Sequence, residues 1–448
     1  MRTPTNVRTR SLIVFLLAHA TAIAQPANFG SADDPSETAS GTVWRRSINA
    51  DVRGGLSLIG PDWRAATGVT VEYRGMDLSA RFNGTFRGGI SGAYDPDING
   101  AYDLLRLVEF VRLTPSPRGF YLRAGPTNRF RLGTGHVANF FSSETVWDDR
   151  TVGLEAMWPG PMFDVRVFSD DVRMNRVMGG RLSVRPLFWA KEENARSLEI
   201  GAAYVTDRRQ FGGEPLITAY TFDLRFTAAS VGEVIIQPFA TVSAYRDAGA
   251  GFGLGGEMLS DNFIDVARFR LRFALYVSDD GFIPGYVGSL YRVNNPSARI
   301  IKSEDFSGTD PIDALVGLRL QDAERGTSFE TELRVLFFDQ FEFWYSFRRH
   351  FGGAPLSEYH LRLFFQTGRL SAQVSQDRGG LKSFFTLFND VGDQTTLQLR
   401  TDYHVARGFW LFVRAIYSYE RAEQQADGVD RFVVQRRFEP YTGLRFRF

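Results

Sequence analysis

Charged side chains at alternate positions are the feature of this sequence most able to do chemistry. Residues 268–277 read RFRLRFALYV, so three arginines alternate with large apolar side chains. Successive side chains of a β-strand point to opposite faces, which places the three arginines on one face. The full inward-facing set that we predict is Arg53, Arg74, Arg81, Arg225, Arg268, Arg270, Arg272, Arg319, Glu330, Glu332, Arg334, Glu342, Arg362 and Arg400.

The balance of this set suggests which solutes it would meet. Mixed charges that face one another across a water-filled lumen keep it hydrated and set a transverse electric field. Arginines outnumber carboxylates, with a cluster at 268–272, and this favours anions or polyhydroxylated solutes. The alternative is that the arginines pair with carboxylates on neighbouring strands and only brace the wall.

A second group of polar residues has the spacing of a calcium loop. The segment DPDINGAYD places oxygen ligands at alternate positions, with Gly100 available for a sharp turn. The ligands of this candidate calcium site are Asp95, Asp97, Asn99 and Asp103. Its last position would require a bidentate glutamate, but the residue there is Arg106, and a polar turn explains the segment as well.

Catalytic groups are few, and we predict no enzymatic activity. The chain has no cysteine, which excludes thiolate metal sites and disulfides. Beyond the N-terminal segment, the histidines are widely spaced and show no metal-ligand pattern. They are His136, His350, His360 and His404. His136, near Ser142 and Ser143, is the one candidate for a serine hydrolase pair.

The element that must position these side chains is the β-strand. Alternation recurs along the chain, with aromatic and aliphatic residues on one face and charged residues on the other. Clear examples are 48–58, 69–74, 78–87, 220–226, 329–337 and 397–402. Segments of about ten residues with this pattern are typical of transmembrane β-barrels. A soluble sandwich or propeller also alternates, but its exposed face would then be strongly charged along the whole chain.

The N-terminus has the composition of a processing segment. Residues 1–24 combine arginines, an apolar stretch and a small-x-small site, as in a secretory signal peptide. Residues 25–43 are small, polar and acidic, and we expect a disordered periplasmic leader. The remaining residues, 44–448, form one uninterrupted domain. With 52 basic and 51 acidic residues the net charge is +1, which argues against a nucleic-acid partner.

The C-terminus carries a resemblance to a known class. The chain ends YTGLRFRF, with Leu444, Phe446 and Phe448 on one face and arginines on the other. This resembles the last strand of Gram-negative outer-membrane β-barrels of the porin-like type. The resemblance implies an outer-membrane location, an all-β fold with one large antiparallel barrel, and recognition of these three residues by the barrel-assembly machinery.

Turn signals give the strand number and the orientation. We expect about 20 strands, with 18 to 22 allowed, and both termini on the periplasmic side. The predicted periplasmic turns are 75–77, 114–118, 159–162 and 404–408. The predicted extracellular loops are 88–103, 170–179, 278–312 and 420–431. Residues 129–150 break the strand parity, and are expected to be either a strand or a loop folded into the lumen.

Two functions from different classes fit these expectations. The first is a porin-like channel in the outer-membrane lipid for passive diffusion of small hydrophilic solutes, including anions. The second is a non-transporting barrel, either a surface scaffold or part of an export or assembly pathway. An open lumen favours the first, and loops that close the lumen favour the second.

Overall fold

The computed structural model describes most of the chain after residue 46. The residues outside the description are 1–46, 76, 91, 115–119, 175, 209–215, 265, 296–297, 302–313, 317–319, 339, 352–356, 382–393 and 423–429. The predicted signal peptide (1–24), the predicted leader (25–43) and Arg319 therefore lie outside the described residues.

Strands make up most of the described chain. The first twelve are β1 (Ser47–Ile59), β2 (Asp62–Arg74), β3 (Leu78–Gly89), β4 (Gly92–Ala93), β5 (Val108–Leu113), β6 (Tyr121–Gly125), β7 (Gly153–Pro159), β8 (Phe163–Ser169), β9 (Val177–Val184), β10 (Glu199–Asp207), β11 (Ile217–Arg225) and β12 (Ala229–Val231). The second twelve are β13 (Val234–Tyr245), β14 (Ala250–Phe263), β15 (Ala267–Ser278), β16 (Ala298–Ile301), β17 (Ala314–Val316), β18 (Gly326–Phe337), β19 (Phe341–Phe351), β20 (Ser357–Gln366), β21 (Leu370–Leu381), β22 (Thr395–Ala406), β23 (Phe409–Arg421) and β24 (Asp430–Arg447).

Twenty of these strands form one closed antiparallel barrel, which confirms the predicted fold and strand number. Each barrel strand pairs with the next along the chain, and β24 pairs with β1 to close the ring. The register runs from Asn49 opposite Arg447 to Ile59 opposite Arg437, and beyond it the N–H of Phe448 donates to the carbonyl of Ile48 at 2.9 Å. The short strands β4, β12, β16 and β17 lie outside the ring of twenty strands. They pair with the ends of barrel strands or with each other, and β16 runs parallel to β24.

Helices are short and lie in the connections. They are η3 (Asp95–Asp97), α2 (Ala101–Arg106), α3 (Glu193–Arg196), α4 (Tyr291–Asn294) and η4 (Leu320–Asp322). None of the helices within the described residues has the length and hydropathy to cross a bilayer.

The two faces of each strand differ as the alternation predicts. On β15, Phe273 is 47% exposed and Leu275 is 53% exposed, whereas Arg272 is fully buried on the inner face. A closed sheet has no unpaired edge, so its backbone polar groups are satisfied and its apolar face can meet lipid. Arg270 and Arg272 of the RFRLRFALYV segment are therefore buried on the inner face, Arg268 at the start of β15 is exposed, and Phe273 and Leu275 face outward.

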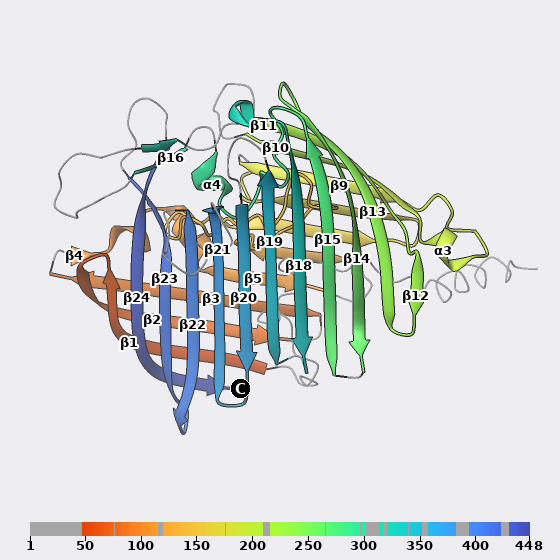
Figure 1. Ribbon diagram of the computed structural model, residues 1–448. Coiled ribbons are helices and arrows are strands. Elements are labelled where there is room, and N and C mark those ends of the chain that lie inside the picture. The colour runs from red at the N-terminus through yellow and green to blue at the C-terminus, as the bar shows by residue number, and fades with distance from the viewer. Residues whose placement is uncertain are drawn as a thin grey trace, which may run out of the picture.

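The two rims of the barrel differ in the length of their connections. We call the rim where β1 begins and β24 ends the terminal rim; in Figure 1 the C-terminus lies at the bottom of the barrel. The strands flanking the predicted turns 75–77, 159–162 and 404–408 all meet at this rim, as do β5 and β6 around 114–118. The four predicted long loops connect strands at the opposite rim, where α4 and β16 also lie (Figure 1).

The residues of the predicted assembly signal lie on the outer face. Leu444 is 47% exposed, Phe446 45% and Phe448 77%. They form an apolar stripe at the end of β24, and their recognition by the assembly machinery stays a prediction.

A charge on the outer face tests its contact with lipid. Phe273 lies near the middle of β15, and Phe273→Arg is expected to lower the free energy of unfolding in lipid vesicles by about 2–4 kcal/mol. Phe273→Leu keeps the face apolar and serves as the control. Equal urea midpoints for the two variants would contradict a lipid-facing position.

Candidate functional site: the lumen

A long connection between β6 and β7 folds into the barrel. Residues 126–152, which we call the inner loop, include side chains with almost no exposure, among them Phe141 and Val146 at 0%. The inner loop forms isolated bridges, from Ala138 to Val287 and from Val146 to Tyr419. The prediction of an inward-folded loop for 129–150 is therefore confirmed, and the alternative of a barrel strand is wrong.

A second segment also folds inward, and this was not predicted. Residues 279–295, part of the segment predicted as an extracellular loop, pack on the inner loop. Phe282, Val287 and Tyr291 form one buried apolar cluster with residues of the inner loop and inner-face residues of β8 to β11 and β13. The Tyr291 hydroxyl donates to the Asp207 carboxylate at 2.7 Å. One side of the lumen is thus filled by apolar packing.

His136 belongs to this filled region. Its ring stacks on Tyr276 and packs against Phe282, with both centroid distances 4.9 Å. Burial lowers the pKa of His136 to about 3, and neither ring nitrogen hydrogen-bonds to a described residue. The hydroxyl of Ser143 instead donates to the Thr151 carbonyl, so the serine–histidine pair considered from the sequence does not form.

Asp149 attaches the inner loop to four other parts of the chain. Its carboxylate lies 3.0 Å from Arg106 on α2, 3.7 Å from Arg176 before β9, 3.0 Å from Arg292 on α4 and 2.9 Å from Arg421 on β23. Burial acts to raise the pKa of Asp149, but the four arginines together lower it from 3.8 to about 2. Because one carboxylate joins four elements, it fixes the position of the inner loop.

Part of the predicted arginine set braces the wall. Arg272 lies 2.8 Å from Glu257 and 3.4 Å from Glu330, and it also donates to the carbonyl of Thr134 in the inner loop. Arg131 of the inner loop reaches Glu332 at 2.6 Å. The wall-bracing alternative therefore describes the fully buried Arg272.

A neighbouring ion-pair group has the same character. Arg334 and Arg362 both bind the buried carboxylate of Glu342, at 2.7 and 2.8 Å. The indole N–H of Trp344 donates to Glu332 at 2.9 Å, and the Arg362 guanidinium lies 4.9 Å from its ring. The remaining members of the predicted set, Arg53, Arg225, Arg268 and Arg270, line none of the three cavities described next.

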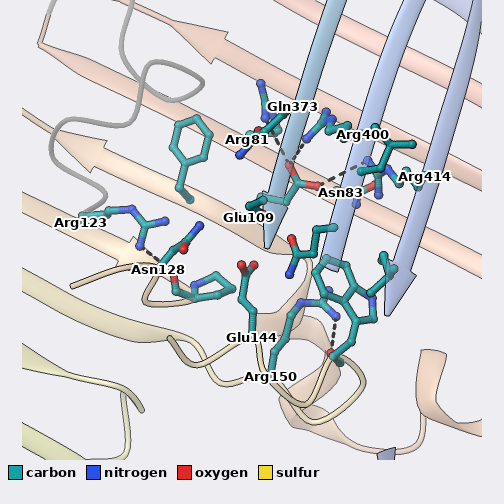
Figure 2. Close-up of a pocket in the computed structure, with 17 residues that line it drawn as sticks. Arg81, Asn83, Glu109, Arg123, Asn128, Glu144, Arg150, Gln373, Arg400 and Arg414 are labelled. Atoms are coloured by element: carbon teal, nitrogen blue, oxygen red, sulfur yellow. Dashed lines mark hydrogen bonds and ion pairs between the residues drawn. The ribbon is translucent and has the colours of Figure 1, made fainter. Parts of the chain in front are cut away.

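The other side of the lumen contains three adjoining cavities. A cavity of about 680 Å³ lies at the terminal rim, one of about 70 Å³ follows, and one of about 120 Å³ adjoins the inner loop. The first two share Glu72, Arg74, Gln366, Ser371 and Arg445 in their walls. The last two share Arg81, Gln373 and Arg400. We call this series the lumen tract, and Figure 2 shows its innermost cavity.

The walls of the lumen tract contain more positive than negative side chains. The arginines are Arg74, Arg81, Arg123, Arg150, Arg400, Arg414, Arg445 and Arg447. The carboxylates are Asp51, Glu72, Glu109, Glu144 and Asp402. Of the predicted inward set, three arginines therefore line it: Arg74, Arg81 and Arg400.

Among the wall residues that the sequence analysis missed, Arg414 and Glu109 escaped it for different reasons. Arg414 is the single charged residue of the apolar run FWLFVRAIY, in which both strand faces are apolar, so the period-two signal is missing there and only the lone arginine in an apolar strand marks the position. Glu109 lies next to Phe110 on the inner face, and two consecutive inward residues break the alternation. No local signal predicts such a position.

The predicted calcium loop uses its carboxylates elsewhere. Asp97 accepts the backbone N–H of Arg87 at 2.7 Å and pairs with its guanidinium. Asp103 accepts the N–H groups of Asn99 and Gly100 at 2.8 and 2.9 Å, at the start of α2. No group of three potential ligands gathers among the described residues. Calcium binding here stays a prediction.

The fold and lumen together define the class of the protein: a closed antiparallel barrel with an apolar outer face and a charged interior is the architecture of transmembrane β-barrels. No protein-family model matches the sequence, and no curated protein matches it.

Several solved structures are similar in shape. OpdK, an outer-membrane protein of Pseudomonas aeruginosa, is 9% identical, with a TM-score of 0.33 over 90% of this chain and 99% of its own. OprD of the same organism is 11% identical, with a TM-score of 0.31 over 94% and 100%. OccAB4 of Acinetobacter baumannii is 10% identical, with a TM-score of 0.31 over 93% and 100%. At these values the similarity carries no information on function.

Removal of the Asp149 charge is expected to loosen the inner loop. Asp149→Asn leaves four arginines without their shared counter-ion, and the free energy of unfolding should fall by about 2–3 kcal/mol. Hydrogen exchange of residues 126–152 should rise. Asp247→Asn makes the same change at a side chain that is 80% exposed and should leave exchange unaltered. If residues 126–152 exchange hydrogen equally slowly in both variants, Asp149 does not attach the inner loop.

The lowered pKa of Asp149 predicts how this attachment depends on pH. The folded-state value of about 2 lies below the ordinary value of 3.8, so the stabilisation is complete above about pH 4. It is lost as the pH falls through the folded-state value. The protection factors of 126–152, in which the observed exchange rate is divided into the intrinsic rate at the same pH, should therefore stay constant from pH 7 to about 4 and fall below it. Asp149→Asn should lack this acid step.

Proposed function

We propose that the protein is an outer-membrane channel for passive diffusion of small hydrophilic solutes, with a preference for anions. The observation that carries the proposal is the lumen tract. The cavity at the terminal rim shares wall residues with the smallest cavity, and the smallest shares others with the cavity beside the inner loop. The three cavities therefore follow one another from the terminal rim to the inner loop. Diffusion requires a polar passage along the axis of a barrel, and the tract provides the part of it between the terminal rim and the inner loop.

The charge of the lumen tract supports the preference for anions. Eight arginines and five carboxylates line its walls, which leaves an excess of positive charge. Several of these charges remain partly exposed: the Arg400 side chain is 29% exposed and that of Glu109 is 23% exposed. Charges that keep contact with water can exchange their partners for a passing solute, unlike the fully buried pairs around Arg272.

The path proposed for solutes runs along one side of the barrel. The apolar cluster of the inner loop and residues 279–295 fills the region next to β8–β11 and β13. The lumen tract instead follows β1–β3, β5 and β20–β24. In Figure 1, β20 to β24 belong to the near wall, with β1 to β3 behind them.

The second candidate is a non-transporting barrel, and one observation favours it. The inner loop and residues 279–295 occupy part of the lumen with buried, ion-paired side chains. If the inner loop seals the tract, the protein acts through its connections at the opposite rim, as a scaffold or in an export or assembly pathway. Conductance separates the two functions.

The first experiment is conductance of the refolded, signal-free protein in a planar bilayer under a salt gradient. The channel proposal predicts stable steps and a reversal potential that indicates anion preference. Arg400→Gln combined with Arg414→Gln should lower the anion-to-cation permeability ratio by about threefold or more, because two lumen charges are lost. Absence of steps from a heat-modifiable, folded barrel would overturn the proposal and favour the non-transporting function.

A matched control separates lumen charge from total charge. Arg246 lies in the connection between β13 and β14, and its side chain is 55% exposed. Arg246→Gln should leave the permeability ratio within about 20% of the unmodified value, because exposed charges outside the pore are screened by salt. An equal effect of the lumen and loop substitutions would contradict a role for the tract.

A further inference from the structure

Glu109 reaches the lumen because β5 carries a β-bulge opposite β3. The pairing passes from Arg81↔Phe110 directly to Phe82↔Val108, so Glu109 is skipped in the register. A bulge inserts one residue into a strand and redirects side chains, often beside a functional site. Phe110 is 2% exposed beneath the Arg81 guanidinium, and Glu109 pairs with arginines of the inner face. Both residues therefore face inward.

The Glu109 carboxylate lies among arginines from three different strands. It is 3.6 Å from Arg81 on β3, 3.5 Å from Arg400 on β22 and 3.7 Å from Arg414 on β23. Figure 2 shows these contacts converging on its two oxygens. Charge-assisted hydrogen bonds are normally about 2.7–2.9 Å long, so the carboxylate is shared by three cations and tightly bonded to none.

Two of the three arginines around Glu109 have few other counter-ions, whereas Arg81 also pairs with Glu72. Arg414 has one ion-pair partner within the part of the chain that the structure describes, and it is Glu109. Arg400 also lies 3.8 Å from Asp402, but Asp402 binds Arg445 more closely, at 3.0 Å. Positive charge near Arg400 and Arg414 thus exceeds what the neighbouring carboxylates neutralise.

We propose that Glu109 is an internal counter-ion, which occupies the position that a passing anion would take among Arg81, Arg400 and Arg414. This inference rests on the proposed function and adds a residue that controls anion affinity. A carboxylate solute that enters the innermost cavity has the same charge and the same kind of acceptor oxygens as the Glu109 side chain. It therefore competes with Glu109 for the N–H donors of the three arginines. The bulge holds the competitor permanently in place.

The consequence is weak anion binding, which transport requires. A site that binds too tightly retains its solute, and conduction needs binding that is strong enough for capture and weak enough for release. Without Glu109, Arg400 and Arg414 would face an entering anion with little opposing charge, while Arg81 would keep its pair with Glu72. With Glu109 present, each anion must displace a tethered carboxylate and is readily displaced in return.

Glu144 provides a matched control from the same cavity. It belongs to the inner loop and lines the innermost cavity together with Glu109. In Figure 2 its carboxylate lies apart from Arg81, Arg400 and Arg414, on the side of Arg150. Glu144→Gln therefore removes the same charge from the same cavity without removing the competitor at the arginine cluster.

The test is calorimetric titration of the detergent-folded, signal-free protein with acetate, whose carboxylate matches that of Glu109. We expect Glu109→Gln to bind acetate about tenfold more tightly than the unmodified protein, because a fixed like charge no longer opposes the anion. Glu144→Gln should change the affinity less than about threefold, since its charge is more distant and screened. Equal effects of the two substitutions, or no gain in Glu109→Gln, would overturn the proposal.

Two further variants guard against altered folding. Glu109→Asp keeps the charge but withdraws it from the arginines by one methylene, and its acetate affinity should lie between those of the unmodified protein and Glu109→Gln. Adding Arg414→Gln to Glu109→Gln removes one charge of each sign and should return the affinity to within about threefold of the original. An Asp variant no tighter than the unmodified protein would count against the proposal.

The two proposals fail separately. Acetate binding is measured in detergent and does not depend on conduction, so a barrel without conductance disproves the channel while leaving the comparison of Glu109 with Glu144 valid. In a conducting protein, acetate should also interrupt the current for longer in Glu109→Gln than in Glu144→Gln. Equal interruption times would contradict the role given to Glu109.

Discussion

Side chains on a closed β-barrel can point only outward or inward, and this choice governs where each charge of the strands can lie. The outer face must be apolar to contact lipid, so the charged residues of the strands gather in the lumen. A charge removed from water there needs a partner of opposite sign. The lumen therefore contains both the ion pairs that hold the walls together and the partly exposed charges that line the lumen tract.

The inner loop decides which arginines take which role. It packs on β15 and β18, where Arg272 loses all contact with water and is held by Glu257 and Glu330. It leaves space beside β3, β22 and β23, where Arg400 remains partly exposed. Chemically equal side chains thus act as wall braces on one side of the barrel and line the lumen tract, as the proposed solute contacts, on the other.

Two single carboxylates have opposite effects on the arginines around them. Asp149 lies 2.9 to 3.0 Å from three of its four arginine partners, and this firm attachment fixes the inner loop. Glu109 lies 3.5 to 3.7 Å from its three partners, and this looser arrangement allows exchange with a solute. The difference follows from their supports: Asp149 lies on a loop that can adjust to its partners, whereas Glu109 is held by a strand within the wall.

The sequence by itself determined the barrel, the strand number, the inward direction of Arg272 and Arg400, and the rim at which each predicted turn lies. These features depend on period-two alternation and turn residues, which are local properties of the chain. The inward fold of 129–150 was one of two alternatives that the sequence left open, because the segment disturbed the count of strands.

Only the tertiary structure decided which inward charges meet. Arg272 and Arg400 both occupy inward positions of alternating segments, and their different surroundings depend on barrel closure and on where the inner loop packs. Residues 279–295 looked like an exposed loop, because their apolar partners are distant in sequence. Glu109 was missed because a bulge is defined by the pairing of two strands, and one strand's sequence does not contain that register.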